Sequence, residues 1–159
     1  MNKETSLIKY AIIYLSKFSS SKKNLEKILK NKIGRMKVEK KDKFVLYNSI
    51  PEIILKLENN KLIDDKNYSL SKIRSLAIQG RSKLFVKSYL VQKGIKEIII
   101  LNTIEEFEHQ NPGWEKESAK IFARKKNLSK DPENKEKNLN KMARAGFTYE
   151  LCKNTLKID

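Results

Sequence analysis

Few side chains in this sequence are of the types that carry out chemistry. His109 is the only histidine and Cys152 the only cysteine among the 159 residues. Nothing at short spacing from either forms a metal-binding or nucleophile set, so neither a zinc site nor a nucleophile–base pair is expected. We interpret His109 as an exposed loop residue, and Cys152 as a small core residue beside Leu151 in the last helix. With one cysteine, the chain cannot form an internal disulfide.

Asp64 and Asp65 are the remaining candidates for a catalytic pair or metal ligands. They lack a third ligand nearby, and they stand directly before a helical pattern. A carboxylate there accepts backbone N–H groups and favours the positive end of the helix dipole, so capping explains them more simply. The 5 glycines are dispersed and form no phosphate-binding loop. The sequence therefore predicts a protein that is not an enzyme and holds no cofactor and no metal.

Charge is the strongest signal in the composition. The chain has 35 Lys and Arg against 19 Asp and Glu, a formal charge of +16. Eleven basic and three acidic residues fall within 17–43, and ten basic and four acidic residues within 116–144. Such clusters favour a polyanionic partner, nucleic acid above all. The alternative is a set of solvated, Lys-rich helical faces in a chain that is also rich in Asn and Ile.

The sequence gives no sign of a membrane protein. It has no run of about 18 apolar residues, the length that a spanning helix needs. The apolar stretch at residues 1–18 has no small-residue cleavage site, so we expect a first helix rather than a signal peptide. The single cysteine suits a reducing compartment, and we predict a cytoplasmic protein.

Apolar residues recur at helical spacing along the whole chain. In the first third, Thr5 or Ser6 could cap the first helix, and Ser19-Ser20-Ser21 offers the cap of the second. Ser49 to Pro51 is typical of a helix start, because proline fits a first turn. A basic stretch over about residues 35–43 is predicted to link the second and third helices.

Ile98 to Leu101 could form either a buried strand or part of a helix. We predict a helix, since the chain offers no second strand and an isolated strand is unstable. Further on, Asp131-Pro132-Glu133 combines a capping acid, a first-turn proline and an acid, which indicates a helix start. The last helix is predicted from Thr148 to about Leu156.

Two segments of the chain align without a gap at an offset of 52 residues. Leu90 to Ile95 aligns with Met142 to Phe147, which places Gly94 over Gly146. Glycine is required there if each helix ends in a left-handed residue. A weaker copy exists near Leu29, where Ile33 replaces the glycine and the helix is expected to continue toward Gly34. Chance similarity between helical pairs is the alternative.

The predicted fold is all-α: three tandem three-helix repeats with about nine helices, elongated, and with mainly nearest-neighbour contacts. The predicted boundaries are 1–62 for the first repeat with its basic linker, 63–110 for the second and 111–159 for the third.

The order of four motifs resembles the RecX family. Ala11 to Leu15, followed by Ser21 and Leu25, is similar to the opening helix pair of that family. Leu62 to Tyr68 resembles its Leu-x-Asp-Asp-x-x-aromatic junction between the first two repeats. Gly80-Arg81-Ser82 together with Leu90 to Ile95 resembles its central repeat. Arg144 to Tyr149 resembles the Arg-x-Gly-Phe-Ser-Tyr signature of its last repeat. Ile33 and the basic linker depart from the pattern, and both departures lie in the first repeat.

This resemblance implies tandem three-helix repeats, a place in DNA repair, homologous recombination and the SOS response, and binding in the groove of a RecA filament on single-stranded DNA. It implies suppression of strand exchange and of ATP hydrolysis by the filament. We expect a monomer whose partners are RecA and single-stranded or double-stranded DNA. The alternative is a stand-alone basic DNA-binding protein such as a helix-turn-helix regulator. The predicted RecA- and DNA-binding surface consists of basic residues on or beside the repeat helices: Arg74, Arg81, Lys83, Lys87, Lys93, Arg124, Lys125, Lys126 and Arg144. The predicted structural positions are Asp64, Asp65, Gly94, Gly146 and Phe147.

Overall fold

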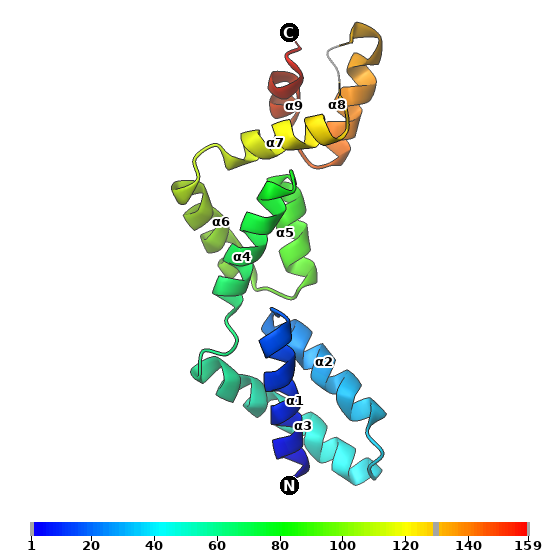
Figure 1. Cartoon of the computed structure of the whole chain (residues 1–159), viewed down its shortest axis with the longest axis vertical. Helices are drawn as coiled ribbons and strands as arrows, with labels where there is room; N and C mark the ends of the chain where they lie inside the picture. The colour runs from blue at the N-terminus through cyan, green and yellow to red at the C-terminus, as the bar shows by residue number, and fades with distance from the viewer. Residues whose placement is uncertain (1, 129–130, 159) are drawn as a thin grey trace. The chain divides into compact units, whose positions relative to one another are not determined.

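The computed structural model describes residues 2–128 and 131–158 of the chain, and all regular structure within them is helical (Figure 1). This confirms the all-α prediction and the helical assignment of Ile98 to Leu101. The elements, in chain order, are α1 Lys3–Lys17, α2 Lys22–Arg35, α3 Lys40–Asn59, α4 Asp65–Ile78, α5 Lys83–Gln92, α6 Glu97–Gln110, α7 Trp114–Lys125, a 3-10 turn η1 Pro132–Asn134, α8 Lys135–Arg144 and α9 Tyr149–Leu156. No helix among the described residues is long and apolar enough to cross a membrane.

The chain forms two compact units. The first comprises Met1–Tyr68 with Lys93–Ile95, and the second comprises Ser69–Gln92 with Lys96–Asp159. In the first unit, α2 packs along α3, and α1 packs against both. One apolar core holds these helices together, built from Leu7, Ala11, Leu25, Leu29, Ile33, Leu46, Ile50, Ile53, Leu57 and Ile63.

The start of α1 corrects the predicted cap. Asn2 is the N-cap, and its side chain accepts a hydrogen bond from the Glu4 backbone N–H at 3.3 Å. Thr5 and Ser6 lie inside the first turn, where the helix has already begun. Asn, Ser and Thr all suit an N-cap, and the apolar pattern alone could not choose among them.

The start of α3 is also earlier than predicted. The helix begins at Lys40, and Pro51 lies inside it. Proline has no N–H for the carbonyl four residues before it, which usually disfavours a helix interior. Here Ile50 and Ile53 flank the proline and are buried in the core, while Pro51 itself is exposed. Burial of the flanking residues outweighs the lost hydrogen bond, and the non-helical part of the basic linker shrinks to residues 36–39.

The end of α2 agrees with the expectation for the first repeat. The helix continues past Ile33, which is buried, and ends at Arg35. Gly34 is therefore part of the helix rather than a left-handed stop. A turn of the kind predicted at Gly94 and Gly146 is absent from this place because Ile33 points into the core as an ordinary helical residue.

The second unit contains two groups of buried side chains. Those contributed by α4 to α7 are Ile73, Leu76, Val86, Leu90, Ile100, Ile104, Phe107 and Trp114. Those contributed by α7 to α9 are Ala119, Ala123, Met142, Phe147, Cys152 and Leu156, and they form one cluster. Cys152 and Phe147 are buried as predicted, and burial raises the pKa of the Cys152 thiol. The last helix, predicted from Thr148 to about Leu156, begins at Tyr149, and Thr148 is its N-cap, whose side chain accepts the Leu151 N–H. The three successive buried groups are compatible with three repeats, whose boundaries stay a prediction.

Candidate binding surfaces and helix joints

A set of polar contacts at the N-terminus of α2 ties the first unit together. The Ser21 hydroxyl donates to the Lys93 carbonyl at 2.6 Å. The Lys22 backbone N–H donates to the Asp65 carboxylate at 2.8 Å, and the Lys22 ammonium pairs with Glu58 at 2.7 Å. The hydrogen bond from Lys22 to Glu58 raises the pKa of the ammonium. We call these contacts the first joint.

The same contacts recur within the second unit, at the N-terminus of α5. The Ser82 hydroxyl donates to the Ala145 carbonyl at 2.6 Å. The Lys83 backbone N–H donates to the Glu115 carboxylate at 2.9 Å, and the Lys83 ammonium pairs with Glu108 at 2.7 Å. This second joint repeats the first donor by donor. Such a correspondence is what tandem copies of one helical unit produce.

Each joint solves the same physical problem. The first N–H groups of a helix have no partner within the helix. Ser21 accepts the Asn24 N–H at 3.1 Å, and Ser82 accepts the Phe85 N–H at 3.1 Å. A carboxylate from another helix takes the N–H that follows each serine. Because each serine hydroxyl also donates outward, one side chain both caps its helix and fixes that helix to a carbonyl distant in sequence.

Glycines complete both joints. Gly94 and Gly146 are left-handed, with φ of +73° and +94°, as predicted. A Cβ at Gly94 would lie 2.5 Å from the Lys23 Cβ, and a Cβ at Gly146 would lie 2.5 Å from the Ser82 Oγ. Each position therefore requires glycine for its backbone conformation and also for the close approach of the helix that it meets.

The two adjacent aspartates have separate structural roles. Asp64 caps α4 by accepting the Lys66 and Asn67 N–H groups at 2.8 and 3.0 Å. Asp65 is buried and takes the Lys22 N–H of the first joint. Burial raises the pKa of the Asp65 carboxyl, and its hydrogen bond from Lys22 opposes that rise. Capping was predicted for the pair, and the contact of Asp65 with α2 was not.

The predicted basic residues do not all occupy one surface. Arg124, Lys125 and Lys126 are exposed at the end of α7, and we call them the α7 basic end. The Lys125 ammonium donates to the Gln79 carbonyl at 3.2 Å, which draws this group to the turn after α4. Arg81 follows in that turn, and its guanidinium lies 4.4 Å from the centre of the Phe85 ring. The structure thus places Lys125 of the α7 basic end against the turn that carries Arg81.

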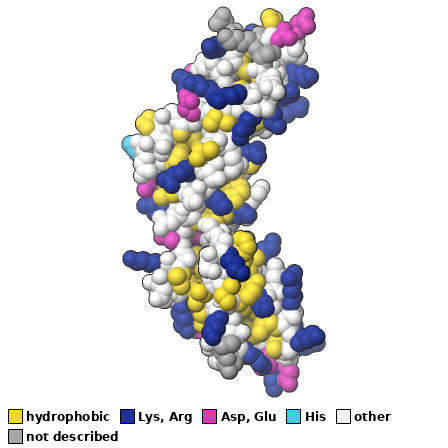
Figure 2. Space-filling model, in the orientation of Figure 1, with side chains coloured by type: hydrophobic (Ala, Val, Ile, Leu, Met, Phe, Trp, Pro, Cys, Tyr) yellow, Lys and Arg dark blue, Asp and Glu magenta, His cyan; other side chains and the backbone are white. Residues whose placement is uncertain are grey.

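The other predicted cations lie elsewhere. Lys83 is half-buried and ion-paired in the second joint, and Lys93 is half-buried beside the first. Lys87 is half-buried on α5, whereas Arg74 on α4 and Arg144 on α8 are exposed. Within the described residues, no hydrogen bond or ion pair joins Arg74 or Arg144 to the α7 basic end. Figure 2 shows Lys and Arg side chains spread over the visible face of each unit.

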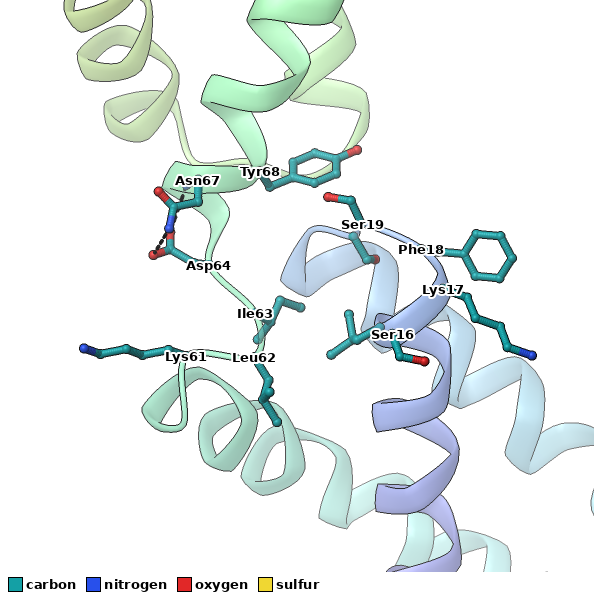
Figure 3. A pocket seen from close by; sticks show the side chains of 12 residues that line it. Ser16, Lys17, Phe18, Ser19, Lys61, Leu62, Ile63, Asp64, Asn67 and Tyr68 are labelled. Atoms are coloured by element: carbon teal, nitrogen blue, oxygen red, sulfur yellow. Dashed lines mark hydrogen bonds between the residues drawn. The ribbon is translucent and has the colours of Figure 1, made fainter.

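A hollow of about 390 Å³ opens in the first unit between the α1–α2 turn and the α3–α4 turn. Figure 3 shows Ile63 and Tyr68 facing it, while Lys17 and Lys61 point away in opposite directions. Its carboxylate, Asp64, is already hydrogen-bonded to Asn67. No group of three His, Cys, Asp or Glu side chains in the described parts of the chain could hold a metal ion. The arrangement of side chains is suited to binding through charge and shape.

Comparisons with known proteins agree in sequence and in fold. No protein-family model matches the chain. The "Regulatory protein RecX" of Myxococcus xanthus (strain DK1622) is 27% identical over 160 residues, which cover 96% of this chain and 84% of the relative. The chain is similar to RecX proteins. A crystal structure of regulatory protein RecX matches with a TM-score of 0.72 and 22% identity over 98% of this chain and 72% of the other. The crystal structure of RecX from Lactobacillus salivarius matches with a TM-score of 0.72 and 21% identity, over 97% of this chain and 94% of the other.

The RecX-like fold explains why sequence reasoning found the glycines and the caps but not the joints. The partners in the joints are 36 to 72 residues apart along the chain for α2, and 25 to 63 for α5. Periodicity within one helix contains no information on such pairs. One signal was present: the pair Ser21-Lys22 recurs as Ser82-Lys83, each at a helix start.

Proposed function

We propose that this chain is a non-enzymatic, cytoplasmic regulator that binds a RecA filament on single-stranded DNA and mainly inhibits its strand exchange and ATP hydrolysis. The similarity to a regulatory RecX protein over nearly the whole chain carries this proposal. The RecX-like fold and the formal charge of +16 support it, because a filament on DNA is a polyanionic surface.

Within the predicted basic surface, we assign the contact with DNA phosphates to Arg81 and the α7 basic end. These side chains are exposed, and Lys125 contacts the α4–α5 turn, which carries Arg81. Lys83 is assigned a structural role, because its ammonium pairs with Glu108 in the second joint, whereas Lys93 contributes only its backbone carbonyl to the first joint and stays in the predicted surface. Phosphate contacts position a protein without reading sequence, which suits a partner that covers any single strand.

The test is RecA ATP hydrolysis and strand exchange on single-stranded DNA with substoichiometric amounts of this protein. We expect both rates to fall. The double variant Arg124→Ala/Lys126→Ala should inhibit less, whereas Lys9→Ala/Lys116→Ala removes the same charge from other exposed positions and should inhibit as the wild type does. Unchanged ATP hydrolysis and strand exchange with the wild-type protein would refute the proposal.

The net charge on its own also suits a second candidate, a stand-alone DNA-binding protein such as a helix-turn-helix regulator. Such a protein binds one duplex sequence far more tightly than others and acts as a symmetric dimer. Strong preference for one duplex sequence in a binding selection, together with no effect on RecA, would favour this candidate over the first.

A further inference from the structure

The first turns of α3 carry exposed apolar side chains that the core does not use. Phe44 is 68% exposed and Val45 is 64% exposed. The core-facing side of α3 is supplied by other residues, such as Leu46 and Ile50, so Phe44 is not needed to hold the helix in place. Tyr47 lies one turn along the same face of α3 and is 37% exposed.

Basic side chains surround this aromatic face. Five cations stand between Arg35 and Lys43 against the two acids Glu39 and Asp42. Both acids are already engaged, Glu39 with Lys41 at 3.2 Å and Asp42 with Lys3. Lys43 donates to the Gly34 carbonyl at 2.8 Å. Within the described residues, no ion pair engages the remaining three cations, which are Arg35, Lys37 and Lys40.

We propose that the α2–α3 corner, formed by Arg35, Lys37, Lys40, Phe44 and Tyr47, binds single-stranded nucleic acid, with a base stacked on Phe44 and phosphates held by the three cations. Exposed rings beside a basic groove are the general means by which proteins bind single strands without reading sequence. A duplex hides its base faces and cannot use such a ring. The inference rests on the proposed function only for the choice of DNA as the strand.

An acidic amphipathic helix is the competing partner, and the distribution of charge speaks against it. The exposed apolar stripe of α3 continues from Phe44 through Pro51 to Leu55. Beyond the corner, however, the charged neighbours on the helix are Glu52 and Lys56, which pair with each other at 2.9 Å. The unpaired positive charge is confined to the end of the stripe that carries Phe44. A single strand of nucleic acid that contacts that end interacts with both the unpaired cations and the Phe44 ring.

The experiment measures binding of the full chain to fluorescein-labelled oligothymidine by anisotropy, over a series of salt concentrations and without RecA. We expect Phe44→Ala to weaken binding about fivefold or more with little change in salt dependence. Lys37→Ala/Lys40→Ala should lower the slope of log affinity against log salt by about 1.4, since each contact with a single-stranded phosphate contributes about 0.7. Phe18→Ala is the matched control, because Phe18 is 56% exposed at the end of α1, and it should bind as the wild type does.

Phe44→Trp adds a direct readout of stacking. It should retain tight binding, and its fluorescence should be quenched by oligothymidine, while the native Trp114 is buried and should not respond. Neither exposed substitution is expected to disturb folding, because alanine is the better helix former and tryptophan about equals phenylalanine. The proposal is overturned if Phe44→Ala binds oligothymidine as tightly as the wild type, or if Phe18→Ala weakens oligothymidine binding as much as Phe44→Ala does. It is also overturned if Phe44→Ala and Lys37→Ala/Lys40→Ala weaken binding of an acidic helical peptide but not of oligothymidine. If the wild-type protein binds oligothymidine as expected but does not inhibit RecA, the result counts against the proposed function and not against this proposal.

Discussion

Replacing Gly146 by alanine tests the second joint, and the same replacement at Gly113 and at Gly34 separates the cost of the backbone conformation from the cost of the close contact. Gly146 is left-handed, and an added Cβ would lie 2.5 Å from the Ser82 Oγ and 3.1 Å from the Leu84 Cβ. Gly113 is left-handed too, with φ of +74°, but a Cβ there meets nothing within 4 Å. Gly34 is helical, and its Cβ would make an ordinary contact with the Tyr47 hydroxyl at 3.6 Å.

The expected magnitudes follow from these environments. Gly113→Ala should cost about 1 kcal/mol, the lower end of the penalty for a left-handed alanine. Gly146→Ala carries the same penalty and also displaces the Ser82 hydroxyl, which removes its bond to the Ala145 carbonyl and its cap on α5. At about 1 kcal/mol for each hydrogen bond, the total comes to about 3 kcal/mol. Gly34→Ala should stabilise the chain by up to about 1 kcal/mol, because alanine is the better helix former.

The assay is urea unfolding followed by far-ultraviolet circular dichroism. Gly113 and Gly146 belong to the same compact unit, so their variants report on the same unfolding event. Thermal midpoints should move in the same order, by roughly 2–4 °C per kcal/mol for a chain of this size. If Gly146→Ala loses no more stability than Gly113→Ala, the contact with Ser82 does not contribute, and the description of the joint is wrong.

Three further predictions concern the joints. Asp65→Ala should destabilise the chain by about 1–2 kcal/mol, because the Lys22 N–H loses its acceptor. Asp65→Asn keeps an acceptor. Since burial raises the pKa of the Asp65 carboxyl, the charged form opposes folding, and the stability of Asp65→Asn relative to wild type should rise as the pH increases through that pKa in urea titrations. Ser82→Ala should cost more than Thr148→Ala in the same assay, because Thr148 caps its helix without a second bond like that of Ser82 to a distant carbonyl; equal losses would contradict this. Lys83→Ala should lower stability by about 0.5–1 kcal/mol, a modest value for a partly exposed ion pair, and leave the salt dependence of DNA binding unchanged, as a binding titration can check.

The fold was predictable wherever local signals agreed with packing. Ser21, Ser82 and Thr148 each precede an apolar helical pattern, and each caps the helix that follows. Prediction failed at α3, where Pro51 indicated a start and the helix in fact begins at Lys40. The proline rule describes the loss of one hydrogen bond, whereas the apolar residues on either side gain burial in a core that the local sequence cannot reveal.

The candidate surfaces were less predictable than the helices. Lys83 and Arg124 are equally good candidates in the sequence, and only tertiary contacts distinguish a lysine held by Glu108 from an exposed arginine. Phe44 was not singled out, because exposure of an aromatic residue depends on which face of its helix the core takes. Clusters of like charge are visible in a sequence, but their division into paired and free side chains is not.

The two joints form a connector that could be moved between helical arrays. Each uses a Ser-Lys pair at a helix start, one carboxylate from each of two other helices, and a Gly turn after a further helix. At α8 the positions that correspond at the offset of 52 residues are Asn134 and Lys135, and Asn134 is the N-cap of α8 but makes no side-chain cap hydrogen bond. An engineered extension of this array would therefore need serine in place of Asn134, beside the existing Lys135, and the added unit would have to supply a carboxylate and a left-handed glycine.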